Sequence, residues 1–296
     1  MGLRWISCSG RSVGASLHAD PTAVHGCTFY SIVLQLRPGA LVALIAADTI
    51  TKTYAEITAL NKVSLTVEQG DAVAMLGQNG AGKSTLTNIV AGLLAPDAPP
   101  DSGRCTVFGR DSAALDPATR EKIALISDEA GPVAWVSADE TARLYRSLYR
   151  RWDGDRFRKL LSQWDIDTAR PLRKLSKGQR RLAEIALATS CRPELVILDE
   201  PFNGLDPVMR VRIQRLLASM NRDEGATIVY ATHVLGEVST IAGRVVILRK
   251  GVKVCDSPID ELDGGVEGAF MRCYGLDDNA DHVGATHAES PGEPAR

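Results

Sequence analysis

Short apolar runs alternate with amphipathic segments along most of this chain, from about residue 44 to residue 275. The apolar runs predict strands, and the segments with apolar residues at helical spacing predict helices. The predicted strands span 43–50, 63–67, 72–76, 104–108, 123–126, 195–198, 227–231, 245–249 and 252–255. The predicted helices span 82–93, 138–150, 153–164, 176–191, 207–221 and 234–242. Strands that alternate with helices in this way indicate an α/β fold with a mostly parallel core sheet.

Three segments depart from this alternation. Residues from about 128 to 175 contain consecutive helices, which predicts a small helical subdomain. Residues 1–43 are rich in Ser, Gly, Ala and His without a sustained period, and we expect a disordered extension or residues upstream of the true translation start. Residues 276–296 are polar, which predicts a disordered tail.

The composition of the 296 residues is that of an ordinary globular protein, 45% hydrophobic and 24% charged. A net charge of −2 gives no overall field that would attract nucleic acid, so we expect no nucleic-acid partner. The 6 cysteines form no C-x-x-C pair, which is typical of reduced thiols in a cytosolic protein. The best candidate for a membrane span, residues 31–47, contains Arg37 and Pro38 and is too short to cross a bilayer.

A phosphate-binding loop with the spacing G-x-x-x-x-G-K-[ST] lies between a predicted strand and a predicted helix. It consists of Gly77, Gln78, Asn79, Gly80, Ala81, Gly82, Lys83, Ser84 and Thr85. Backbone N–H groups of such a loop cradle phosphate oxygens, and the helix start adds the positive end of its dipole. Lys83 can reach the β- and γ-phosphates, and the Ser84 hydroxyl can bind Mg²⁺. The flanking strand and helix argue against the alternative, an ordinary tight turn.

A second chemical signal is the apolar run Leu195–Leu198, which is followed by two acids, Asp199 and Glu200. Four apolar residues predict a fully buried strand, and ligands bind at the carboxyl ends of such strands in open α/β sheets. There Asp199 can contact Mg²⁺ through water, and Glu200 can orient and deprotonate the water that attacks a γ-phosphate. Without the phosphate loop, two solvated acids would be the better interpretation.

A third signal, Leu175 to Gln179, precedes an apolar-periodic helix for which Ser176 is a good N-cap. On its own this segment predicts only a capped helix. Together with the other signals, however, the chain from about 44 to 275 resembles the ATP-binding cassette (ABC) ATPases, the nucleotide-binding subunits of ABC transporters. Residues 77–85 resemble the Walker A loop, 195–200 the Walker B strand and catalytic glutamate, and 175–179 the signature LSGGQ, with Lys177 in place of its first Gly.

Three further positions carry the resemblance. Residues 203–206 resemble the D-loop, which ends at Asp206, and His233 resembles the switch histidine that contacts the γ-phosphate. Tyr54 lies where the family has an aromatic residue that stacks on adenine; the alternative for Tyr54 is a core tyrosine, and for His233 a structural role. The family implies a P-loop NTPase core with a mostly parallel sheet, an antiparallel β subdomain and a small helical subdomain.

The chain departs from the family where a Gln usually follows the strand after the P-loop helix. Here Asp128 is the equivalent, or Glu129 if the register shifts by one. A carboxylate can still contact Mg²⁺ or its water, but it repels the γ-phosphate unless the metal screens it. We therefore expect altered coupling to the nucleotide, with ATP binding retained.

The resemblance implies two cassettes that face each other head to tail. Each ATP would lie between the Walker A loop of one subunit and the signature residues Ser176, Gly178 and Gln179 of the other. A separate membrane permease would be the second partner, which places the chain in the cytoplasm, on the inner face of the membrane. We expect the ATPase subunit of an exporter; the alternatives are a soluble ABC ATPase of translation or DNA repair and a non-catalytic nucleotide sensor.

The predicted helices between 138 and 165 carry many arginines among apolar residues. A solvated basic face over an apolar core explains this pattern. The other interpretation is a docking surface for a segment of the permease.

Overall fold

The computed structural model describes residues 43–127 and 135–276. The predictions of a disordered extension and tail, and those for Asp128 and Glu129, therefore lie outside the described residues. None of the helices in the described part is both long and apolar enough to cross a membrane.

The larger sheet has six strands in the order β10-β9-β3-β8-β7-β6. Its strands are β3 (Ala72–Leu76), β6 (Ile123–Ile126), β7 (Leu195–Asp199), β8 (Thr227–Thr232), β9 (Arg244–Arg249) and β10 (Val252–Pro258). All neighbours are parallel except β10, which pairs antiparallel with β9. Because helices or a second sheet cover both faces, β7 has no exposed apolar side chain, as its continuous apolar run predicts.

The smaller sheet is antiparallel, with the order β2-β1-β4-β5. Its strands are β1 (Ala43–Tyr54), β2 (Ile57–Glu68), β4 (Arg104–Val107) and β5 (Arg110–Asp111). The sequence predicts only 63–67 of β2, because residues 57–62 lack apolar alternation. Pairing with β1 extends that strand, and the tip of this hairpin lines the same cleft as the phosphate loop.

Each of the five helices predicted before residue 224 has a counterpart among the described residues, in the same order. The described helices are α1 (Lys83–Val90), α2 (Pro117–Arg120), α3 (Ala138–Leu148), α4 (Gly154–Gln163), α5 (Lys177–Thr189), α6 (Pro207–Glu224) and α7 (Gly265–Tyr274), with the 3-10 turns η1 (Ser112–Ala114), η2 (Leu172–Lys174), η3 (Leu235–Thr240) and η4 (Ile259–Glu261). Among the described residues before 225, the short α2 is the one α-helix that the sequence does not predict.

Two differences from the prediction lie near the carboxyl end. The helix predicted at 234–242 is the 3-10 turn η3, and α7 was not predicted. Because glycine is a poor helix former, the glycines at 264, 265 and 268 lower the helix propensity of this segment, and the sequence alone does not predict α7. Burial of Val266, Ala269 and Phe270 stabilises it in the fold.

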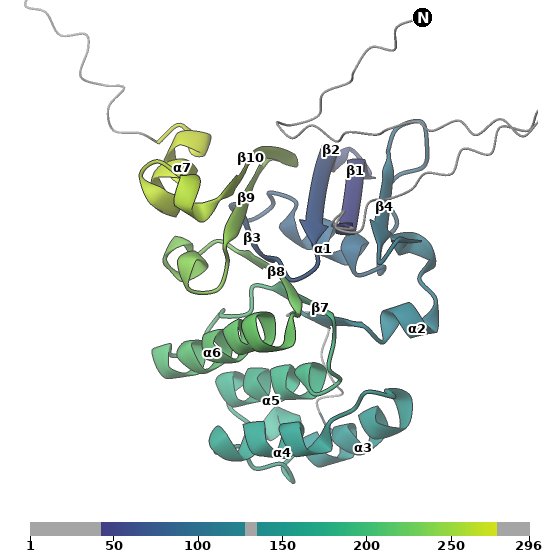
Figure 1. Cartoon of the computed structure of the whole chain (residues 1–296), viewed down its shortest axis with the longest axis vertical. Helices are drawn as coiled ribbons and strands as arrows, with labels where there is room; N and C mark the ends of the chain where they lie inside the picture. The colour runs from purple at the N-terminus through teal and green to yellow at the C-terminus, as the bar shows by residue number, and fades with distance from the viewer. Residues whose placement is uncertain (1–42, 128–134, 277–296) are drawn as a thin grey trace, which may run out of the picture. The chain divides into compact units, whose positions relative to one another are not determined.

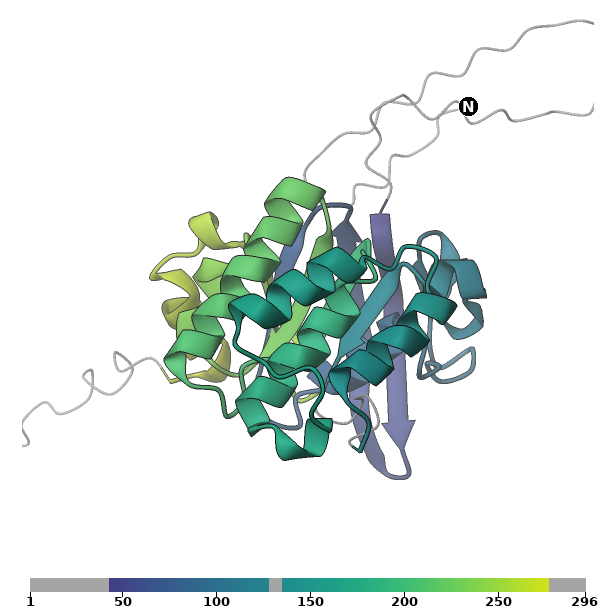
Figure 2. The ribbon, with the colours of Figure 1, turned by 90° about the horizontal axis from the view of Figure 1, so that it is seen from below.

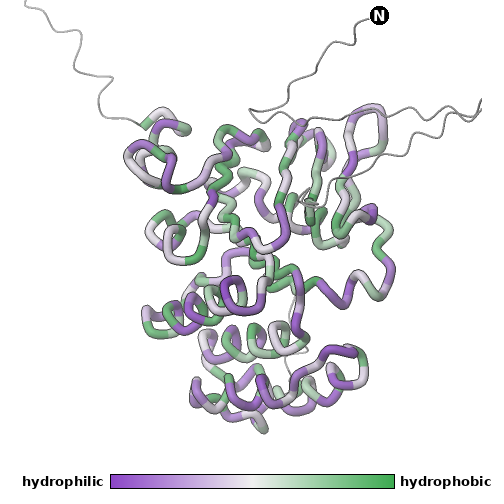
Figure 3. Tube along the Cα trace, viewed as in Figure 1, coloured by the Kyte–Doolittle hydropathy of each residue, from purple (hydrophilic) through white to green (hydrophobic). Residues whose placement is uncertain are grey.

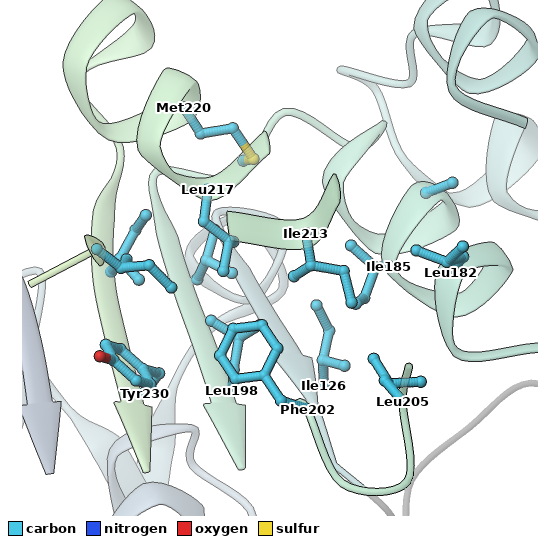
Figure 4. Packing of buried hydrophobic residues seen from close by; sticks show 14 of the residues in the cluster. Ile126, Leu182, Ile185, Leu198, Phe202, Leu205, Ile213, Leu217, Met220 and Tyr230 are labelled. Carbon is cyan, nitrogen blue, oxygen red and sulfur yellow. The ribbon is translucent and has the colours of Figure 1, made fainter. Parts of the chain in front are cut away.

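The larger sheet is the middle layer of the fold. On one face α5 and α6 pack against it: Ile213, Leu217 and Met220 of α6 lie over Leu198 and Tyr230 (Figure 4). Figure 2 shows the teal and green helices α3–α6 in front of the strands. On the other face α1 and the smaller sheet enclose a second core cluster. The central strands are mostly hydrophobic, whereas hydrophobic and hydrophilic residues alternate along the covering helices (Figure 3).

The α6 contact should contribute much of the stability of this core. Leu217→Ala removes a side chain with no exposed surface, so we expect the free energy of unfolding to fall by about 2–5 kcal/mol in urea titration. Val211 lies on the same helix and is 41% exposed, so the matched variant Val211→Ala should change the free energy of unfolding by less than about 0.5 kcal/mol. Equal losses in the two variants would contradict this assignment of the buried face.

Candidate functional site

The phosphate loop connects β3 to α1, and two of its glycines are required by close approaches of the backbone. A Cβ atom on Gly77 would lie 2.6 Å from the carbonyl oxygen of Leu248. A Cβ atom on Gly82 would lie 2.5 Å from the carbonyl oxygen of Ala59, and Gly82 also has a φ of +102°. Only glycine fits at either position without a shift of the neighbouring strand.

Lys83 is the first residue of α1, and its side chain is only 6% exposed. Its Nζ atom donates to the carbonyl oxygens of Gly77 at 2.7 Å and Gln78 at 3.3 Å. The same atom lies 3.4 Å from Oε1 of Glu200. The buried ammonium group is therefore held by the two carbonyls that open the loop and by a carboxylate from β7's end.

Glu200 and His233 each come directly after a core strand, β7 and β8. Because the two strands are parallel neighbours, both residues lie at the same edge of the sheet. Glu200 Oε2 and His233 Nδ1 are 2.9 Å apart, and the backbone N–H of Glu200 donates to the carbonyl of Ala231 at 2.9 Å. The φ of Glu200 is +48°, an uncommon conformation for a residue with a side chain.

The segment after His233 is held by a buried tyrosine of β8. Burial raises the pKa of Tyr230, so its hydroxyl stays protonated. That hydroxyl donates to the carbonyl of Val238 in η3 at 3.1 Å. The strand end and the turn that flank His233 are thereby tied together.

The loop, Glu200 and Tyr54 line one cleft of about 570 Å³. Its described lining residues are Tyr54, Ile57, Thr58, Ala59, Asn79, Gly80, Ala81, Gly82, Lys83, Ser84, Thr85, Glu200 and Lys250. Tyr54 is 46% exposed at the end of β1, which contradicts the alternative of a core tyrosine. Lys83 lies at the buried end, so the cleft offers charge in its depth and an aromatic face at the surface.

Sequence reasoning missed the part of this cleft that comes from the β9–β10 turn. Lys250 lines the cleft, and Gly251 next to it donates its N–H to the carbonyl of Ala81 at 3.1 Å. A Cβ atom on Gly251 would lie 2.8 Å from the carbonyl oxygen of Ala59. The only local signal is the Lys-Gly pair between two strands, which predicts a turn but not its neighbours.

Ser84 and Asp199 are the described candidates for Mg²⁺. The described residues contain no group of three or more His, Cys, Asp or Glu side chains that could hold a metal by themselves. Mg²⁺ takes few protein ligands and completes its shell with water and substrate phosphates. A hydroxyl beside the loop lysine and a carboxylate at a strand end are suitable oxygen donors.

The signature and D-loop residues lie at helix starts and have local structural partners. Ser176 is the N-cap of α5, as the sequence predicts, and forms a capping box with Gln179. Gly178 packs on α6, where a Cβ atom would lie 2.2 Å from Sδ of Met209. Asp206 is the N-cap of α6 and accepts from the N–H of Met209 at 2.9 Å.

These residues are absent from the described lining of this cleft, in contrast to residues 79–85 of the loop. Lys177, which departs from the signature pattern, lies beside the D-loop: a Cβ atom on Gly204 would be 3.0 Å from its Nζ atom. One chain therefore places the loop, Glu200 and Tyr54 in one cleft, with His233 in contact with Glu200, and places the signature outside that lining.

Comparison with known proteins agrees with this architecture. The profile of the family described as ABC transporter matches residues 60–203. The daunorubicin resistance ATP-binding protein DrrA3 of Streptomyces coeruleorubidus is 32% identical over 223 residues, which are 74% of this chain and 69% of that protein. The chain belongs to the ABC transporter ATP-binding family.

Other members of this family are similar over part of their length. The ABC transporter ATP-binding protein sll0415 of Synechocystis sp. is 31% identical over 232 residues; these cover 76% of this chain but only 64% of sll0415. A solved dimeric ABC transporter cassette, MJ0796, superimposes with a TM-score of 0.64 at 25% identity, over 72% of this chain and 98% of that one. The predicted fold, a P-loop ABC ATPase domain with an antiparallel β subdomain and helices, is confirmed.

The position of Tyr54 yields a direct test of nucleotide stacking. Tyr54→Ala should weaken ATP binding about tenfold, because a base that stacks on an aromatic ring gains about 1–3 kcal/mol. Tyr54→Phe keeps the ring and should bind ATP like the original chain. Calorimetric titration measures both, and unchanged affinity in the alanine variant would show that the ring does not contact the base.

Proposed function

We propose that this chain is the ATP-binding and ATP-hydrolysing subunit of an ABC transporter. The observation that carries the proposal is the buried contact between Lys83 and Glu200 at the base of the loop-lined cleft. A structural ion pair would not need a glycine loop around it. A catalytic site for phosphoryl transfer needs the lysine, the carboxylate and the phosphate-binding loop in one place.

The loop N–H groups would bind the phosphate oxygens, and Lys83 would transfer its hydrogen bonds from Gly77 and Gln78 to the β- and γ-phosphates. In the structure Lys83 and His233 both contact the carboxylate of Glu200. A phosphate that draws Lys83 away removes a positive charge from Glu200 and makes it a better base. Glu200 would then take a proton from the attacking water, while His233 keeps the carboxylate oriented.

Mg²⁺, when bound, would neutralise phosphate charge, held by Ser84 directly and by Asp199 through water. Asp128, the third residue predicted at the metal, lies outside the described residues.

The complete site would contain two copies of an ABC cassette. Ser176, Gly178 and Gln179 lie outside the described lining of the cleft of their own chain, and a similar solved cassette is dimeric. The second subunit would contribute the amino terminus of its α5 to the γ-phosphate, where the positive end of the helix dipole favours an anion. Asp206 would lie in the D-loop beside that interface.

A membrane permease would be the second partner, and the chain would be bound through it to the inner face of the cell membrane. The family match supports a transporter, and the resistance function in the name of DrrA3 supports export. A soluble ABC ATPase of translation or repair remains the competing function. Affinity purification of the tagged chain from detergent-solubilised membranes separates the two: co-purification of an integral membrane protein supports transport, and its absence supports the soluble type.

Glu200→Gln tests the catalytic assignment. The variant should bind ATP, lose at least about 100-fold in turnover because the general base is gone, and accumulate as a dimer in size-exclusion chromatography with ATP. Glu194→Gln is the matched control, since Glu194 precedes the same strand at its other end and pairs with Arg151. A Glu200→Gln protein that stays monomeric with normal turnover would contradict the assignment.

A further inference from the structure

The carboxyl-terminal helix α7 contacts the phosphate loop through its last residue, Tyr274. The Tyr274 hydroxyl accepts a hydrogen bond from the backbone N–H of Gln78 at 3.0 Å. The same hydroxyl donates its proton to the carbonyl of Leu248 in β9 at 2.8 Å. A phenol has one proton to donate; since that proton goes to Leu248, the hydroxyl oxygen serves as the acceptor for Gln78.

Several contacts fix the tyrosine ring in this position. It stacks on Phe270, one turn earlier in α7, with ring centroids 4.4 Å apart and an interplanar angle of 22°. The guanidinium of Arg249 lies 5.6 Å from the ring centroid and also donates to the carbonyl of Cys273 at 2.9 Å. The hydroxyl is thus held in place by β9 and α7 together, and Figure 1 shows these elements side by side.

The peptide that Tyr274 contacts is the one that holds the catalytic lysine. The N–H of Gln78 and the C=O of Gly77 belong to the same peptide unit, which is planar. Its N–H donates to Tyr274, and its C=O accepts the shortest hydrogen bond of Lys83, at 2.7 Å. A continuous chain of hydrogen bonds therefore runs from the Lys83 ammonium through this peptide and Tyr274 to Leu248.

We propose that Tyr274 is a positioning residue for Lys83. By holding the Gly77–Gln78 peptide in one orientation, its hydroxyl keeps the lysine at the base of the cleft, ready for the β- and γ-phosphates. A lysine that is already ordered beside the loop loses less side-chain freedom when it moves from Gly77 to the phosphates, so the hydroxyl favours ATP binding. The inference rests on the proposed binding of ATP in this cleft.

The test is Tyr274→Phe, which keeps the stacked ring and removes the hydroxyl. ATP affinity, measured by titration calorimetry on the full chain, should fall about fivefold, the cost of immobilising one long side chain that the free chain no longer holds in place. Affinity for AMP should not change, because AMP has no β- or γ-phosphate for Lys83 to contact. In a Lys83→Met background, Tyr274→Phe should have no further effect on ATP affinity.

Val266→Ala is the structural control, since it weakens the packing of buried α7 far from the hydroxyl. It should lower the melting temperature and leave ATP affinity unchanged. If the original chain binds no ATP, the proposed function fails. If the original chain binds ATP and Tyr274→Phe binds it equally well, only the role of Tyr274 is overturned. The same holds if Tyr274→Phe lowers ATP affinity by the same factor in the Lys83→Met background.

Discussion

The burial of one ammonium group determines how this site must be built. Lys83 is almost fully removed from water, and a buried cation is costly unless acceptors surround it. The acceptors are the carbonyl oxygens of Gly77 and Gln78, which follow β3, and the carboxylate of Glu200, which follows β7. His233, which follows β8, contacts that carboxylate. These strand ends meet because β3, β8 and β7 are parallel neighbours, so the sheet order itself is a condition for the site.

Local sequence patterns were sufficient for the elements whose role is local. The loop glycines, the buried strand before Asp199 and the N-cap Ser176 all follow from spacing and residue type within about ten positions. His233 carries no such signal, and only its place in the order of family motifs indicated it. Its contact with Glu200 is made between two strand ends 33 residues apart in the chain.

The remaining parts could not be predicted because tertiary contacts stabilise them against weak local preferences. Residues 57–62 form a strand through pairing with β1, and α7 forms despite its glycines because its apolar side is buried. Lys250 and Tyr274 reach the loop only through the register of β9 and the docking of α7. A sequence window centred on either residue contains nothing that points to a site about 170 or more residues earlier.

We expect the triphosphate of ATP to lie along the glycine loop, with Lys83 at its β- and γ-phosphates. A crystal structure of the chain with Mg²⁺ and a non-hydrolysable ATP analogue measures this most directly. Phosphate oxygens should lie within hydrogen-bond distance of Lys83 Nζ, and the adenine ring should lie against Tyr54. A nucleotide bound elsewhere, for example in the basic groove of about 500 Å³ between α4 and α6, with Lys83 still on Gly77, would contradict it.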